Sequence, residues 1–133
     1  MVYNILVCDD EKDIVNALRI YLEAEGYCVF AAYNGREALE VLAQHEIHLV
    51  LMDISLPFFN GYHWCREIRN VSKVPVIFIS SASDNMNIVM AMNMGGDDFI
   101  AKPFDLNVLT AKVQALLRRT YDFALQSEVL ECG

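Results

Sequence analysis

Five polar residues directly follow apolar runs of this sequence, and their side chains could share one chemical task. They are three carboxylates, a hydroxyl and an ammonium: Asp9, Asp10, Asp53, Ser80 and Lys102. Carboxylates brought together repel, since two like charges about 4 Å apart cost about 4 kcal/mol at an effective dielectric constant of about 20. A divalent cation relieves this repulsion, and oxygen ligands that leave room for a phosphate suit Mg²⁺. A carboxylate can also accept a phosphoryl group, so these residue types predict Mg²⁺-assisted phosphoryl transfer.

Each of the five residues also has an ordinary structural explanation. Asp9 and Asp10 could simply begin a helix, where acidic side chains are favoured. Asp53 could be a turn residue, Ser80 a loop hydroxyl, and Lys102 a solvated surface charge. The ordinary explanation is weakened because all five residues fall at the carboxyl ends of expected strands, and none falls at an amino end.

Apolar runs alternate with helical patterns along the chain and predict an α/β fold. The strands are expected at residues 5–8, 27–32, 48–52, 76–79 and 98–101. Five helices are expected, the first at residues 11–25 with Gly26 as its left-handed stop, and the others after Asn34, Gly61, Asp84 and Asp105. Strands that alternate with helices indicate a parallel sheet, and ligands of such a sheet bind outside the carboxyl ends of its strands.

Length, apolar content and charge narrow the class of protein. The 133 residues, of which 55% are hydrophobic, fit one domain. No apolar run reaches the roughly 18 residues of a membrane span, and no basic region precedes the first strand, so we expect no membrane segment and no signal peptide. The formal net charge of −8 disfavours nucleic-acid binding by this chain, because such binding requires Lys and Arg to neutralise phosphates.

The cysteines and histidines form no pattern of metal ligands or disulfides. Four cysteines are scattered through the chain, which indicates reduced thiols in a cytoplasmic protein. Three of them lie in apolar runs and are expected in the core: Cys8, Cys28 and Cys65. The histidines are expected to be surface or core side chains: His45, His48 and His63.

In their order along the chain, these residues resemble the receiver domains of bacterial two-component response regulators. The resemblance covers roughly residues 3–119 and is carried by Asp9-Asp10, Asp53 with Leu56-Pro57 and Gly61, Ser80, and Lys102-Pro103-Phe104. The segment from Gly95 to Phe104 is close to the family's Gly-Ala-Asp-Asp-Tyr-x-x-Lys-Pro-Phe. The resemblance implies a flavodoxin-like, doubly wound sheet of five parallel strands in the order 2-1-3-4-5, with five helices.

The resemblance also implies roles in phosphoryl transfer. Asp53 would accept the phosphoryl group of a sensor histidine kinase. Asp10 would ligate Mg²⁺ directly, Asp9 would act mostly through water, and the backbone carbonyl of Ser55 would be another ligand. Lys102 would pair with a phosphoryl oxygen. The domain would thus catalyse its own phosphorylation and dephosphorylation rather than act as an enzyme on other substrates.

The residues expected to switch conformation depart from the family's common pattern. Ser80 would donate its hydroxyl to the phosphoryl group, but it stands where Thr is commoner and lacks the methyl group that stiffens χ1, so we expect a less sharply held switch. Phe99 would turn inward as Ser80 moves. Many members of the family have Tyr at this position, and because Phe99 has no hydroxyl, it would signal through packing alone. Phe58-Phe59 occupies a loop where Gly-Met is frequent, either for local packing or as an exposed contact for a partner. The Lys102–Pro103 bond is expected to be cis by resemblance.

The last helix resembles the transcription-factor subfamily that carries a C-terminal winged helix. We therefore expect a receiver domain at residues 1–120, and a linker or the start of an effector domain at residues 121–133. The subfamily forms a phosphorylation-dependent homodimer through its fourth helix, fifth strand and fifth helix, using charge pairs between the subunits. In this chain, some of these pairs could be supplied by Asp97, Asp98, Lys112, Arg118 and Arg119. Ile88 and Asn93 stand where charged partners are usual.

Three other classes share part of the pattern. A flavin-binding module needs a loop rich in hydroxyls and glycine after the first strand, where this chain has Asp9, Asp10 and Glu11. A phosphatase of the haloacid dehalogenase type needs a second Asp two positions after its nucleophile, where this chain has Ser55. A degenerate receiver that only binds proteins would not need the complete set of site residues.

Overall fold

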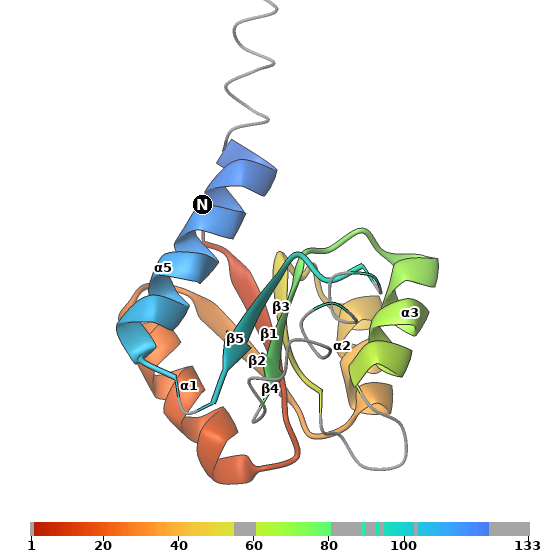
Figure 1. The fold of residues 1–133 in the computed structure, drawn as a ribbon, viewed down its shortest axis with the longest axis horizontal. Helices are drawn as coiled ribbons and strands as arrows, with labels where there is room; N and C mark the ends of the chain where they lie inside the picture. Colours follow the sequence, from red (N-terminus) through yellow and green to blue (C-terminus); the bar gives the residue numbers. More distant parts are fainter. Residues whose placement is uncertain are drawn as a thin grey trace, which may run out of the picture.

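Five short parallel strands form the centre of the molecule, with helices on both faces (Figure 1). The computed structural model describes residues 2–54, 61–80, 89, 93, 95–102 and 104–122. The strands are β1 (Asn4–Cys8), β2 (Cys28–Ala32), β3 (Leu49–Asp53), β4 (Val76–Ser80) and β5 (Asp98–Ala101). Their order is β2-β1-β3-β4-β5, and every neighbouring pair is parallel, which confirms the predicted sheet.

Helices cover both faces of the sheet, and each face carries two of the helices that the structure describes in full. α1 (Lys12–Ala24) and α5 (Leu106–Leu117) lie on one face, and α2 (Gly35–Gln44) and α3 (Gly61–Val71) lie on the other (Figure 1). These are the four α-helices that the described residues contain, where the sequence predicted five. The difference is the helix expected between Asp84 and Gly95, of which only positions 89 and 93 are described, and both are helical.

The helices begin and end at the residues that the sequence marks for this purpose. The side chain of Asn34 accepts a hydrogen bond from the Glu37 backbone N–H at 2.9 Å, which caps α2. Asp105 caps α5 in the same way by accepting from the Asn107 N–H at 2.7 Å. Gly26 follows α1 with φ of +98°, a conformation that other residues rarely adopt.

The core consists of two apolar layers, one on each side of the sheet. Alternate residues of β1 point into different layers: Leu6 and Cys8 face α2 and α3, whereas Ile5 and Val7 face α1 and α5. Strands β3 and β4 are buried along their whole length, as expected for strands with helices on both faces. The core thereby holds the carboxyl ends of β1, β3 and β4 in fixed positions relative to one another.

The prediction that Cys28 belongs to the core is wrong. Cys8 and Cys65 are buried, but Cys28 is exposed. Cys28 is the first residue of β2, and β2 lies at the edge of the sheet with β1 as its neighbour there. An edge strand has less cover than a central one, and an apolar run in the sequence does not reveal which strand will lie at the edge.

The contact between Gly35 and Trp64 gives a sharp test of this packing. A Cβ atom on Gly35 would overlap the Trp64 ring at Cδ2. We expect Gly35→Ala to lower the free energy of unfolding by about 1–3 kcal/mol, because the added methyl group overpacks the space between α2 and α3. The urea midpoint, followed by the fluorescence of the chain's single Trp, measures this loss. Arg36→Ala, at the next and exposed position of α2, is the matched control; an equal midpoint for both variants would contradict the prediction.

Candidate functional site

The predicted site residues meet at the carboxyl edge of the sheet. Asp9 follows β1, Asp53 ends β3, Ser80 ends β4, and Lys102 follows β5. Parallel pairing brings these ends together, since Asp53 lies opposite Ile79 and Ser80 lies opposite Ala101. The four strand ends therefore deliver three different functional groups to one place, as the sequence predicted for this edge.

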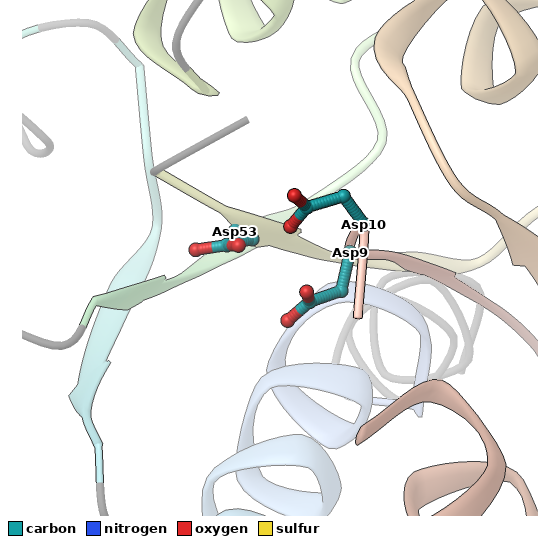
Figure 2. Close-up of side chains that lie close together, drawn as sticks. All are labelled: Asp9, Asp10 and Asp53. Carbon is teal, nitrogen blue, oxygen red and sulfur yellow. The ribbon is translucent and has the colours of Figure 1, made fainter. Parts of the chain in front are cut away.

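The three carboxylates converge on one point (Figure 2). Asp9, Asp10 and Asp53 each offer an oxygen, and these oxygens lie within 4.8 Å of one another. Asp9 has 0% of its surface exposed and Asp53 has 2%, whereas Asp10 is exposed. Two buried carboxylates and one that reaches solvent form an all-oxygen donor set, which suits a hard divalent cation that keeps part of its water shell.

Lys102 supplies the positive charge of the pocket. Its Nζ lies 3.2 Å from Oδ2 of Asp9 and 3.8 Å from Oδ2 of Asp53. The side chain of Lys102 is 16% exposed, so its charge acts in a partly desolvated environment. The ammonium offsets part of the repulsion among the carboxylates and lies within reach of any group carried by Asp53.

Both oxygens of Asp9 already have partners in the protein. Oδ2 accepts from Lys102, and Oδ1 accepts from the backbone N–H of Glu11 at 2.9 Å. The sequence alone did not predict the Glu11 contact, although an Asp that accepts from the backbone N–H two residues further on is a common turn. Asp9 is therefore oriented by the protein itself, whereas Asp10, at the next position, is exposed and brings its carboxylate to the same cluster from the solvent side.

Ser80 and Phe99 occupy neighbouring strands next to the pocket. Ser80 is buried with 2% exposure at the end of β4. Phe99, in β5, lies opposite Phe78 and packs half-buried against the core layer beneath α2 and α3. Ser80 itself lies opposite Ala101, so the hydroxyl and the aromatic ring expected to respond to it lie on adjacent strands with an offset of two residues.

Several predicted positions lie outside the described residues. They are the proposed carbonyl ligand Ser55, the loop pair Phe58-Phe59, Ile88, Pro103 with its expected cis bond, and the tail from 123 to 133.

Cys8 lies beneath the pocket as a protonated thiol. Its Sγ donates to the backbone carbonyl of Asn34 at 3.4 Å. Burial, and then the nearby charges of Asp9 and Asp53, raise the pKa of the Cys8 thiol far above its usual range. Cys8 therefore adds no further negative charge to an already acidic site.

Comparison with known proteins agrees with the geometry. The family model described as the response regulator receiver domain matches residues 5–114. The transcriptional regulatory protein YvcP of Bacillus subtilis (strain 168), itself uncharacterized, is 43% identical over 136 residues, which cover 98% of this chain and 57% of the relative. The chain spans between 51% and 58% of the length of the first three curated relatives that it matches.

Solved structures give the same result. A two-component response regulator from Clostridium difficile superposes with a TM-score of 0.86 at 35% identity, covering 90% of this chain and 98% of that one. The N-terminal domain of the nisin resistance regulator NsrR superposes with a TM-score of 0.79 at 46% identity, covering 87% and 98%. Within the described part of this chain, none of the helices has the length and apolar character needed to cross a membrane. The chain belongs to the family of response regulator receiver domains.

Proposed function

We propose that Asp53 accepts a phosphoryl group from the phosphohistidine of a sensor histidine kinase with the help of Mg²⁺, and that this reaction controls transcription through a longer protein. One observation carries the proposal: three carboxylates and one ammonium from distant parts of the sequence share a pocket at the carboxyl edge of the sheet. Residues 1–120 would form the receiver domain, and residues 121–133 would lead to an effector domain. The names of the curated relatives, which include transcriptional regulators, support that output.

The donor set fits Mg²⁺. Asp10 and Asp53 would hold the ion directly, Asp9 would do so mostly through water, and the carbonyl of Ser55 would complete the protein ligands. Asp9 suits an indirect role because Lys102 and Glu11 already engage its two oxygens. The bound ion would neutralise charge on the transferred phosphoryl group.

Asp53 and Lys102 would perform the central steps. A carboxylate oxygen of Asp53 would attack phosphorus while the P–N bond of the phosphohistidine breaks and its electron pair returns to the imidazole nitrogen, which takes up a proton from solvent. Lys102, 3.8 Å from Oδ2 of Asp53, would pair with a phosphoryl oxygen. Ser80 would donate its hydroxyl to another oxygen, and Phe99 would follow it inward.

The other classes fit the pocket less well. Two buried carboxylates and a third beside them would repel a flavin phosphate that brought no metal. A purely protein-binding domain would have no need of the ammonium held between Asp9 and Asp53.

Acetyl phosphate with Mg²⁺ should add one phosphoryl group to the intact protein, and peptide mapping should place it on Asp53. Repeated turnover of phosphate esters would instead favour a phosphatase.

A phosphorylation-dependent homodimer is the proposed consequence. Within one chain, Asp97 accepts from Arg69 Nη2 at 3.1 Å, and Asp98 accepts from Lys112 Nζ at 3.1 Å. Both acids expected in intersubunit pairs thus have partners in their own chain. Arg118 is exposed near the end of α5, so pairing across a dimer would require these contacts to rearrange or to be shared.

Light scattering tests the proposed dimer. Beryllofluoride with Mg²⁺ mimics the phosphoryl group, and we expect it to double the weight-average mass at micromolar concentrations of protein. Asp53→Asn treated in the same way should stay at the mass of the untreated protein. A wild-type mass that does not change upon treatment would refute the dimer while leaving the phosphorylation site intact.

A further inference from the structure

A cluster of aromatic rings closes the amino edge of the sheet, at the opposite end from the acidic pocket. Tyr3 precedes β1, His48 precedes β3, and Tyr121 lies in the turn that follows α5. The ring centroids of Tyr3 and His48 are 5.2 Å apart, those of His48 and Tyr121 are 5.3 Å apart, and those of Tyr3 and Tyr121 are 5.6 Å apart. The start of β1 accordingly lies near the C-terminal half of α5 in Figure 1.

One hydrogen bond ties the end of α5 to the sheet. The hydroxyl of Tyr121 donates to the backbone carbonyl of His48 at 2.7 Å, across 73 positions of sequence. Burial, and then the charge of Glu46, raise the pKa of the Tyr121 phenol, so the hydroxyl keeps its proton and acts as a donor. The contact is therefore specific in direction and distance and does not consist of packing alone.

The acceptor side of this contact is held firmly. His48 is buried. Its ring Nδ1 accepts from the Asn4 backbone N–H at 2.8 Å, and its backbone N–H donates to the Asn4 backbone carbonyl at 2.8 Å. The Asn4 side chain donates to the carbonyl of Glu46 at 2.6 Å. Because β1 holds His48 from both its backbone and its ring, the His48 carbonyl presents a fixed target to Tyr121.

The donor side lies where the helix changes its geometry. α5 ends at Leu117, and the chain continues as a π-helical turn from Arg118–Asp122. Such turns are rare, occur mostly as single turns, and are frequent at functional sites. Arg118, Arg119 and Thr120 are exposed, whereas Tyr121 is half-buried against the sheet. Tyr121 is thus the last described side chain that holds the departing chain to the domain.

We propose that Tyr3, His48 and Tyr121 form a latch that fixes the direction in which the chain leaves the receiver domain. The purpose of such a fixed exit rests on the proposed function, in which an effector domain follows. The latch is joined to the acidic pocket by a single strand, because His48 directly precedes β3, the buried strand that ends in Asp53. The exit point and the proposed phosphoryl acceptor therefore lie at the two ends of one strand.

Trypsin can measure how often the latch opens. Residues 120–133 contain no Lys or Arg, so cleavage after Arg119 releases them as one peptide. Tyr121→Phe keeps the ring and removes the donor, and we expect it to release this peptide about five-fold faster, as the loss of one ordinary hydrogen bond implies. Rates are normalised to those of the urea-denatured chains, which removes any effect of the substitution on the protease itself.

Tyr21→Phe is the matched control. It removes the hydrogen bond from the Tyr21 hydroxyl to Oδ1 of Asn107, at the other end of α5, and should leave the release rate unchanged. Wild-type release from Tyr121→Phe would overturn the proposal. An equal rise in cleavage after Lys112 would also overturn it, because the substitution would then have loosened the whole fold rather than the exit.

A distance measurement tests the exit direction itself. The single Trp, Trp64, serves as donor, and an acceptor dye on Cys132 reports the tail in a Cys28→Ser background, since Cys8 and Cys65 are buried. Tyr121→Phe should broaden the distribution of donor–acceptor distances, and an unchanged distribution would refute the fixed exit. Neither experiment uses phosphorylation, so a negative result in either one would leave the assignment of Asp53 untouched.

Discussion

Asp53→Asn is expected to lower phosphoryl incorporation from acetyl phosphate and Mg²⁺ at least about a hundredfold, because the amide cannot act as the attacking carboxylate. Asn keeps nearly the same shape at a site with 2% exposure, so the sheet should fold normally. Intact-mass spectrometry after a fixed incubation measures the incorporation. Far-UV circular dichroism should show equal secondary structure in the two proteins.

Asp105→Asn is the matched control for this substitution. It makes the same chemical change at the N-cap of α5, where Asn and Asp cap about equally well. Its phosphoryl incorporation should therefore equal that of the wild type. If Asp53→Asn still gained the phosphoryl mass, another residue would be the acceptor and the assignment of the site would fall.

Asp10→Asn is expected to raise the Mg²⁺ concentration needed for half-maximal phosphorylation by about tenfold to a hundredfold, by analogy with the cost of disturbing metal ligands. In the absence of Mg²⁺ the same substitution should raise the melting temperature, because it removes one of three carboxylates that lie within 4.8 Å of one another. The substitution would thus weaken the use of Mg²⁺ but stabilise the metal-free protein. A merely structural role for Asp10 would not produce both effects.

Asp13→Asn distinguishes a ligand effect from a general loss of negative charge. Asp13 lies in the first turn of α1, is exposed, and is close to Asp10 in the sequence. We expect its Mg²⁺ requirement and its melting temperature without Mg²⁺ to stay near those of the wild type. An equal shift of the Mg²⁺ requirement in both variants would point to long-range electrostatics and away from coordination by Asp10.

The sheet and its pocket were predictable because they depend on patterns that are local in sequence. Uninterrupted apolar runs marked β1, β3 and β4, and the polar residue after each run marked the edge where Asp9, Asp53 and Ser80 meet. The caps at Asn34 and Asp105 followed from side chains that compete well for free backbone N–H groups.

The features that the sequence did not predict depend on contacts between distant segments. His48 was expected only as a surface or core histidine, because the aromatic partners of its ring lie at positions 3 and 121. The π-helical turn was missed because Arg118 and Arg119 looked like the ordinary end of an α-helix. A search of the amino edge of the expected sheet, like the one applied to its carboxyl edge, would have brought Tyr3 and His48 together.

The balance of charge in the pocket has a consequence for how the two ligands would affect each other. Three carboxylates and the ammonium of Lys102 leave a formal excess of two negative charges, which one dication would cancel. A phosphoryl group on Asp53 would replace a single negative charge with about two. The modified domain should therefore hold its metal more tightly than the unmodified one, and by thermodynamic reciprocity the metal should favour the modified state to the same degree.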